Sequence, residues 1–396
     1  MPAVVLPPTP PVLVLAPYQS ADWILDHLRP QGRVVGMSRG QVSLTDLVIA
    51  AAQKTREADV LISVYGFEPD DIERLRGQQE AGTIRTLRII VPNVSKADEA
   101  DYAKMRAMIG ETNIIYSAMH MKTAVVQGGT WSIAIRGSVN LYTHLVAQHF
   151  DIDDSPEICA EILRYAKNPQ RKLAYPKPAT EPDLARAILD GFQRGGRIFG
   201  IAQGFSLFAL IGAILEKTGP ARISGVVSAL GNRQTDALAS LPNMRLVIGR
   251  GVAELPKSTG FRPCAVFGER LRVARTHAKL VTVRNNDWNI TIRTSANLTA
   301  SLGAEQYDIS DNAAIADHVD AWIDFIFDET PPGAVFPAVV TAVYERSLLG
   351  LLHEAPPNTE IITDRLDMPA LLTPPKPYPT DTLAALMAPP RQLTLY

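Results

Sequence analysis

The chain carries one sequence pattern twice, and this duplication restricts its possible folds more than any other feature. Residues 120–141 read HMKTAVVQGGTWSIAIRGSVNL, and residues 277–298 read HAKLVTVRNNDWNITIRTSANL. The two stretches align without a gap at a constant offset of 157 residues, and the alignment continues to residues 154 and 311. Of the 35 aligned positions, 15 are identical, whereas chance would give about 2. We therefore expect two halves of similar structure.

Strand-like apolar runs alternate with amphipathic, helix-like segments in both halves. In the first half, for example, a helical pattern over residues 43–57 precedes an apolar run over residues 59–67. This alternation is typical of an α/β sandwich. The 396 residues exceed the usual size of one domain. We predict a first half over residues 1–167, a linker over 168–182, a second half over 183–355 and a proline-rich C-terminal arm over 356–396.

Composition excludes several classes of protein. Hydrophobic residues make up 46% of the chain, which is incompatible with general disorder. The net charge of -2 gives no overall basic field for polyanions. The longest apolar stretch, residues 205–215, is too short to cross a bilayer, so we expect no stable membrane insertion. Two cysteines and an N-terminus without a signal-peptide pattern lead us to expect a cytoplasmic protein.

Polar residues recur in the repeat at identical spacing. Histidine and lysine are two residues apart in each copy, so on a strand their side chains would share a face. Serine and asparagine are two apart as well. Buried polar groups without partners are costly, and folding alone seldom requires such a set twice. The set comprises His120, Lys122, Ser138 and Asn140 and their counterparts His277, Lys279, Ser295 and Asn297.

Two such sets facing each other across a pseudo-twofold axis would form one pocket suited to a phosphate group. The lysine ammonium groups and asparagine amides would bind the tetrahedral anion. One histidine would attack phosphorus, and the other would protonate the departing alkoxide and later activate water. The paired lysines supply positive charge, so we expect neither a metal nor a cofactor. The sequence also lacks the phosphate-loop, zincin and serine-hydrolase motifs.

The duplicated His-x-Lys and Ser-x-Asn pattern resembles the phospholipase D superfamily. The resemblance implies an α/β fold of two tandem phospholipase D-like α/β/α sandwich halves packed as a pseudo-dimer. It also implies that His120, Lys122, Asn140 and their counterparts are catalytic, and it favours His120 as the nucleophile. In the family an acidic or amide residue after the asparagine supports the site, and Glu305 and Gln148 occupy that position. With Ser138 and Ser295, these two residues are expected to help bind substrate.

Two departures from the family pattern bear on the substrate. Lipases of this family usually have Asp five residues after the lysine, where this chain has Gln127 and Arg284. Thr294 replaces the glycine found in the first copy. The form without Asp is more similar to the nuclease and tyrosyl-DNA phosphodiesterase branch. The resemblance therefore implies a phosphodiesterase that acts on nucleic acid, either DNA or RNA.

Two alternatives remain open from the sequence. The protein could be a phospholipid hydrolase or phosphatidyltransferase. It could instead be a catalytically idle binding or structural protein in a viral or defence assembly, with protein partners held through the C-terminal arm. The remaining histidines have no spacing partners, and the cysteines are expected to fill apolar space.

Overall fold

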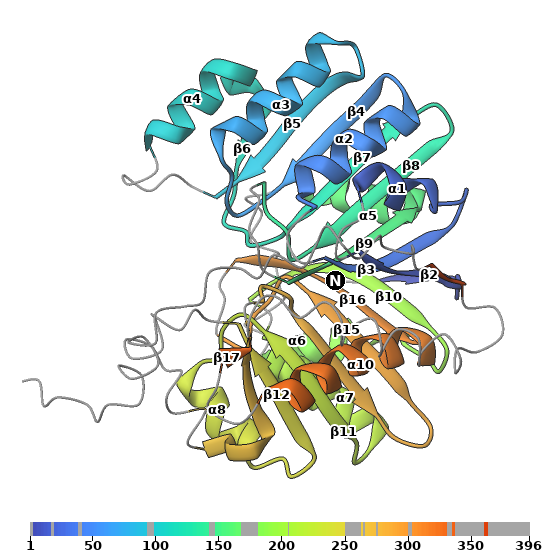
Figure 1. The fold of residues 1–396 in the computed structure, drawn as a ribbon, viewed down its shortest axis with the longest axis vertical. Helices are drawn as coiled ribbons and strands as arrows, with labels where there is room; N and C mark the ends of the chain where they lie inside the picture. Colours follow the sequence, from blue (N-terminus) through green and yellow to red (C-terminus); the bar gives the residue numbers. More distant parts are fainter. Residues whose placement is uncertain are drawn as a thin grey trace, which may run out of the picture.

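A computed structural model describes most of the two predicted halves (Figure 1). The described residues are 3–16, 20–38, 42–92, 99–141, 147–167, 181–204, 206–249, 263, 266–274, 276–299, 303–330, 335–336 and 360–362. The predicted linker therefore lies outside the described residues except at its last two positions. The predicted C-terminal arm lies outside them except at residues 360–362.

The first half alternates strands and helices as its periodicity predicts. Serine caps start three of its helices. Ser20 accepts from the backbone of Trp23, Ser43 accepts from that of Asp46 in a reciprocal capping box, and Ser155 accepts from that of Ile158. The elements are β1 (Val4–Leu6), β2 (Pro11–Ala16), α1 (Ala21–Asp26), β3 (Arg33–Ser38), α2 (Leu44–Thr55), β4 (Ala58–Ser63), α3 (Pro69–Glu80), β5 (Ile84–Val91), α4 (Glu99–Ile109), η1 (Glu111–Asn113), β6 (Ile114–Tyr116), β7 (Thr123–Gly128), β8 (Trp131–Gly137), β9 (Gln148–Asp154) and α5 (Pro156–Ala166).

The second half follows the same plan. Asn312 caps its last helix at the position that Ser155 occupies in the first half. The elements are α6 (Glu181–Ile188), β10 (Arg197–Gln203), α7 (Leu207–Thr218), β11 (Arg222–Val227), α8 (Asn232–Ala239), β12 (Met244–Ile248), η3 (Gly268–Arg270), β13 (Leu271–Ala274), β14 (Leu280–Arg284), β15 (Asn289–Thr294), β16 (Ala304–Asp311), α10 (Ala313–Glu329) and β17 (Val335–Phe336). Strand β18 (Glu360–Ile362) follows in the predicted C-terminal arm.

Two sheets of matching topology confirm the predicted duplicated α/β fold. Within the described residues each sheet has nine strands. The strand order of one sheet contains β3-β9-β8-β7-β4-β5-β6, and that of the other contains β10-β16-β15-β14-β11-β12-β13. In both, antiparallel strands occupy one side and parallel strands the other. Each of the seven strands in one run therefore has a counterpart in the other.

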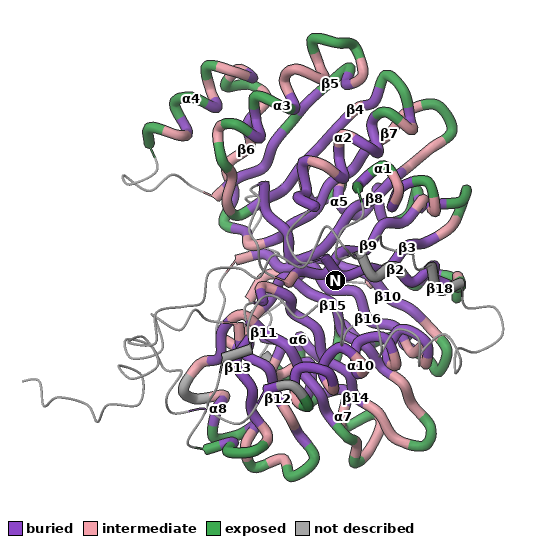
Figure 2. Tube along the Cα trace, viewed as in Figure 1, coloured by how far each residue is buried: buried purple, intermediate pink, exposed green. Residues whose placement is uncertain are grey.

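Helices cover both faces of each sheet, and the last helix of each half also contacts the opposite half (Figure 1). Helix α5 packs on β7 and β8 and contacts β10 of the second sheet. Helix α10 packs on β11, β14 and β15 and contacts β2 of the first. One apolar cluster accordingly joins Ile158 and Ile162 of α5 to Phe199 and Ile201 of β10. Figure 2 shows that the backbone where the two halves meet is buried.

Two short edge strands cross the predicted boundary between the halves. Strand β1 pairs with β10 of the second sheet, although it starts the chain, and β18 pairs with β2 of the first sheet. The last two residues of the predicted linker belong to α6. The predicted linker between the halves, residues 168–182, remains a prediction.

Glycines allow two aromatic rings to lie against the central strands at equivalent places. A Cβ atom at Gly36 would lie 2.2 Å from the ring of Phe150, and one at Gly200 would lie 2.4 Å from the hydroxyl of Tyr307. Both distances are far below van der Waals contact. A larger residue at either position would therefore require the aromatic ring or its surroundings to shift.

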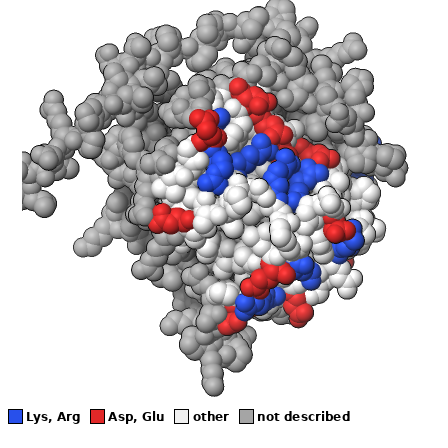
Figure 3. Space-filling view, turned by 90° about the horizontal axis from the view of Figure 1, so that it is seen from below, with Lys and Arg blue, Asp and Glu red and all other residues white. Residues whose placement is uncertain are grey.

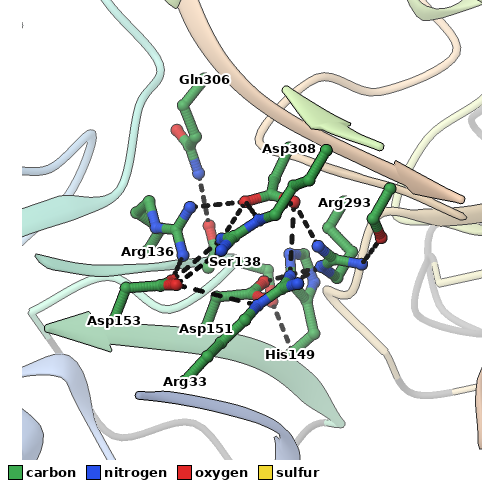
Figure 4. Close-up of polar contacts among 12 residues, drawn as sticks. Arg33, Arg136, Ser138, His149, Asp151, Asp153, Arg293, Gln306 and Asp308 are labelled. Atoms are coloured by element: carbon green, nitrogen blue, oxygen red, sulfur yellow. Dashed lines mark hydrogen bonds and ion pairs between the residues drawn. The ribbon is translucent and has the colours of Figure 1, made fainter. Parts of the chain in front are cut away.

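A buried cluster of charged side chains holds the two halves together (Figure 4). Asp308 of β16 forms hydrogen bonds with guanidinium groups from both halves. Burial alone would raise the pKa of Asp308, but the guanidinium groups, Arg197 foremost, outweigh it and hold the pKa well below its usual range. The cluster comprises four arginines and three aspartates: Arg33, Arg136, Arg197, Arg293, Asp151, Asp153 and Asp308.

Charge on the outer surface is mixed. On the face seen in Figure 3, Lys and Arg side chains lie beside Asp and Glu side chains. Exposed ion pairs such as Arg186 with Glu216 contribute to this mixture. Among the described residues, no helix has the length and apolar character needed to cross a membrane.

The buried cluster yields a stability prediction. Asp308→Asn should lower the free energy of unfolding by about 3–5 kcal/mol, because it leaves buried guanidinium groups without their shared carboxylate. Urea denaturation followed by circular dichroism measures the loss. Asp59→Asn is the control, because Asp59 pairs with Arg85 on the surface, where removing a carboxylate costs little. Equal losses in the two variants would contradict a stabilising role for the cluster.

Candidate active site

The two His-x-Lys segments lie just before β7 and β14, and each strand begins one residue after its lysine. The histidines and lysines thus precede the strands, so the shared face that a strand would give them does not apply. The backbone N–H of His120 instead donates to the carbonyl of Ala304 at 2.8 Å, and that of His277 donates to Ala147 at 2.8 Å. Each acceptor belongs to the opposite half. These crossed bonds bring both histidines to the junction of the halves.

Each imidazole ring is held by a serine carbonyl of the opposite half. Nδ1 of His120 lies 3.0 Å from the carbonyl oxygen of Ser295, and Nδ1 of His277 lies 2.8 Å from that of Ser138. A carbonyl oxygen can only accept, so Nδ1 carries the hydrogen in both rings. In the neutral rings Nε2 therefore has the lone pair.

The two serine hydroxyls contact the residues predicted to support the site. Ser295 donates to the carboxylate of Glu305, and Ser138 donates to Oε1 of Gln148 at 3.4 Å. Glu305 also lies 3.2 Å from Nδ1 of His120. Both supporting residues are buried rather than on the surface. The site thus has a carboxylate on the His120 side and an amide at the equivalent place.

The two lysines are buried beside their histidines. Nζ of Lys122 donates to the carbonyl of His120 at 2.8 Å, and Nζ of Lys279 donates to that of His277 at 2.8 Å. Burial lowers the pKa of Lys122 to about 8. Burial and the nearby charge of Lys122 lower the pKa of Lys279 well below its usual value. Each bond uses one of three ammonium N–H donors.

The four basic groups influence one another's charge. Burial lowers the pKa of both imidazoles, and the charges of both lysines lower the pKa of His277 further. For Glu305, burial would raise the pKa, but contacts with His120 and Lys122 lower it. An anion bound among these groups would compensate their positive charge and favour their protonated forms.

In each half, the predicted asparagine is held by the loop after the strand that pairs with β7 or β14. These loops follow β4 in the first half and β11 in the second. Oδ1 of Asn140 accepts from the backbone of Gly66 at 3.3 Å, and Oδ1 of Asn297 accepts from Ala229 at 3.1 Å. The amide oxygens therefore act as acceptors, and an amide nitrogen can act only as a donor. Donors suit the oxygen atoms of a phosphate group.

Sequence reasoning did not assign a pair of residues that clamps the lysine backbones across the junction. The backbone of Lys122 donates to Oε1 of Gln306 at 3.1 Å, and that of Lys279 donates to Nδ1 of His149 at 3.4 Å. Burial lowers the pKa of His149 to about 3, so its ring is neutral and can accept. The sequence does contain a signal for this pair, because His149 and Gln306 align in the repeat and both are polar.

The departures from the family pattern have structural roles. Gln127 donates to the hydroxyl of Ser132 at 3.2 Å within the β7–β8 hairpin. Arg284, at the end of β14, pairs with Asp320 of α10 at 3.0 Å. The hydroxyl of Thr294 donates to the carbonyl of Gln306 at 2.6 Å. None of these contacts involves the imidazoles or lysine side chains.

His144 and Cys264, for which we expect no active-site role from the sequence, lie outside the described residues. Cys159 is buried in the apolar cluster between α5 and β10. Within the part of the chain that the structure describes, no group of three or more His, Cys, Asp or Glu residues is arranged to hold a metal.

Solved structures resemble this architecture. Polyphosphate kinase from Porphyromonas gingivalis superposes with a TM-score of 0.50 at 15% identity, covering 78% of this chain and 53% of that one. Phosphatidylserine synthase from Haemophilus influenzae gives 0.47 at 11% identity, covering 70% of this chain and 82% of that one. Nuc, a phospholipase D family member from Salmonella typhimurium, gives 0.28 at 18% identity, covering 35% of this chain and 92% of that one.

This chain spans about half the length of the polyphosphate kinase. No protein-family model matches the sequence, and no curated protein matches it. The likeness to the polyphosphate kinase shows a shared α/β fold over 78% of this chain, as the resemblance noted in the sequence leads us to expect. A shared fold does not determine the reaction, which must be argued from the site.

The lowered pKa of Lys122 predicts pH-dependent anion binding. Only the protonated ammonium attracts an anion, so affinity for sulfate should fall as pH rises through about 8, by up to about tenfold per pH unit. Isothermal titration calorimetry between pH 6 and 9.5 measures this change, because the charge of sulfate is constant there. Lys122→Met should weaken binding at pH 7, whereas the exposed Lys104→Met should not. Affinity that stays constant across the range would contradict the prediction.

Proposed function

We propose that this protein is a metal-independent phosphodiesterase that cleaves nucleic acid through a phosphohistidine intermediate. The observation that carries the proposal is the pair of crossed Nδ1 contacts, from His120 to the Ser295 carbonyl and from His277 to the Ser138 carbonyl. They fix both rings in the tautomer whose Nε2 can accept or transfer a proton or attack phosphorus.

In the first step, the Nε2 lone pair of His120 attacks phosphorus and the bond to the leaving oxygen breaks. His277, protonated in the substrate complex, gives its Nε2 proton to that oxygen. The products are an alcohol and a phosphohistidine that retains the other ester group. Burial and the lysine charges keep His277 neutral without ligand, and the charge of a phosphodiester favours its protonation.

In the second step, His277 takes a proton from water through Nε2, and the water oxygen attacks phosphorus. The phosphorus–nitrogen bond breaks and its electron pair returns to His120. The product is a phosphate monoester, and both histidines regain their starting states. Lys122 and Lys279 supply positive charge to the non-bridging oxygens in both steps, with the amides of Asn140 and Asn297 as further donors.

The difference between the supporting residues favours His120 as the nucleophile. Phosphorylation at Nε2 leaves a positive charge on the ring, because Nδ1 keeps its hydrogen. The carboxylate of Glu305, 3.2 Å from Nδ1 of His120, stabilises that charge. Gln148 occupies the equivalent place and carries no charge. The resemblance to the family favours the same assignment.

The substrate class rests on the motif. This chain has Gln127 and Arg284 where lipases of the family usually carry Asp. In this respect its motif is similar to that of the nuclease and phosphodiesterase branch. The net charge of -2 gives no overall basic field, which favours recognition by a local pocket.

Activity on DNA and RNA oligonucleotides tests this proposal directly. Cleavage should persist in EDTA, and His120→Ala and His277→Ala should each lower kcat by a factor of about 10² or more, since each removes a group needed for bond making or proton transfer. Arg85→Ala, on the surface, is the control. Release of headgroup from phospholipid vesicles without oligonucleotide cleavage would favour the lipase alternative. Lack of turnover on both would overturn the enzymatic proposal.

Trapping identifies the nucleophile. A phosphodiester analogue with a good leaving group, quenched in alkali to preserve the phosphorus–nitrogen bond, should label the peptide that contains His120 in mass spectrometry. The His277→Ala variant should accumulate the label, because it lacks the base for the second step. Glu305→Gln should slow labelling more than Gln148→Ala does. Label on His277 alone would reverse the assignment.

A further inference from the structure

One aromatic side chain stands exposed at the candidate active site. The ring of Tyr65 lies edge-to-face with that of His120, with 4.8 Å between centroids. Nζ of Lys122 lies over the ring at 5.6 Å from its centroid. Even so, 53% of Tyr65 is exposed. The ring therefore forms part of the wall beside His120 and presents a free surface to solvent.

The backbone around Tyr65 is fixed. Val64 donates to the carbonyl of Ile90 at 3.0 Å, and Leu141 donates to that of Gly66 at 3.2 Å. The bond from Gly66 to Asn140 ties the same loop to the site. Rigid placement lowers the entropy lost when a ligand packs against the ring.

The second half has no aromatic ring at the matching place. Gly66 and Ala229 donate to equivalent asparagines, so the residues before them, Tyr65 and Ser228, are counterparts. Ser228 is small and half-buried. The fold therefore does not require a large ring at this loop, and the ring occurs only on the side of the proposed nucleophile.

We propose that Tyr65 is a stacking platform for an unpaired nucleobase on the part of the substrate that remains on His120 after the first step. This inference rests on the proposed function and narrows its substrate to single-stranded nucleic acid. A leaving group departs opposite the nucleophile, whereas the retained ester group stays near His120 and hence near Tyr65. Stacking accepts any base, because every base has a π face.

The surroundings favour a base over a lipid chain. Among the described residues, the exposed large hydrophobic side chains are Tyr65, Val5 and Val266. Val5 lies on edge strand β1, and Val266 precedes η3. Tyr65 is accompanied instead by an imidazole and an ammonium, which suits a planar polar ring next to a phosphate.

Two esters with the same leaving group test the role of Tyr65. Thymidine 5′-p-nitrophenyl phosphate retains a base after loss of p-nitrophenol, and methyl p-nitrophenyl phosphate does not. Wild type should prefer the thymidine ester in kcat/KM. Tyr65→Ala should reduce that ratio by about 5-fold to 150-fold, the range for loss of one stacked base. Tyr65→Phe should keep the ratio, because it keeps the ring, and so should Ser228→Ala.

A binding measurement separates this inference from the proposed reaction. Wild type should bind thymidine 5′-monophosphate more tightly than inorganic phosphate, and Tyr65→Ala should lose this difference. If the difference is seen without turnover of either ester, the stacking role stands and the reaction fails. Turnover with an unchanged ester ratio in Tyr65→Ala would overturn the stacking role and leave the reaction intact. Equal slowing of both esters, with the ratio unchanged, would make Tyr65 structural.

Discussion

The buried ion cluster at the junction of the halves makes the shared site possible. The first half supplies two arginines and two aspartates, whereas the second supplies two arginines but only Asp308. Asp153 of the first half compensates the difference by pairing with Arg197 of the second at 2.6 Å. Separating the halves would leave a guanidinium without a counter-charge, which is costly in a buried place. The cluster therefore acts against opening of the junction.

The same strands carry the cluster and the site. Strand β9 has Gln148 at its start and Asp151 and Asp153 further along, and β16 has Glu305 near its start and Asp308 further along. Fixing the aspartates fixes the relative position of the two supporting residues. Through Ser138 and Ser295, this position reaches the imidazoles. The geometry of the site thus depends on ion pairs made by aspartates that lie three to five residues further along the same strands.

The repeat predicts the parts that are local in sequence and misses those that depend on the other half. Strand and helix order follows from periodicity, and the residues of the candidate site follow from polar identities in the gapless alignment. The exchange of β1 into the second sheet has no local signal, because Val4–Leu6 is short and its partner strand is far along the chain. The position of His120 depends on its backbone hydrogen bond to Ala304 of the other half, and Tyr65 lies outside the aligned repeat. Such contacts become visible only when both sheets are in place.

Departures from symmetry give the two halves different tasks. A phosphodiester has two similar non-bridging oxygens, which paired lysines and asparagines suit, but its reaction distinguishes an attacking side from a leaving side. The chain differs between halves where this distinction matters: Glu305 faces Gln148 in the alignment, and Tyr65 matches Ser228 in the loops. Both differences lie on the His120 side. In the proposed reaction, a carboxylate that stabilises a charged ring and an aromatic surface for the retained group would serve the same step, because both would act while phosphorus is bonded to His120. The symmetric residues would hold the phosphate, and the asymmetric ones would set the direction of its transfer.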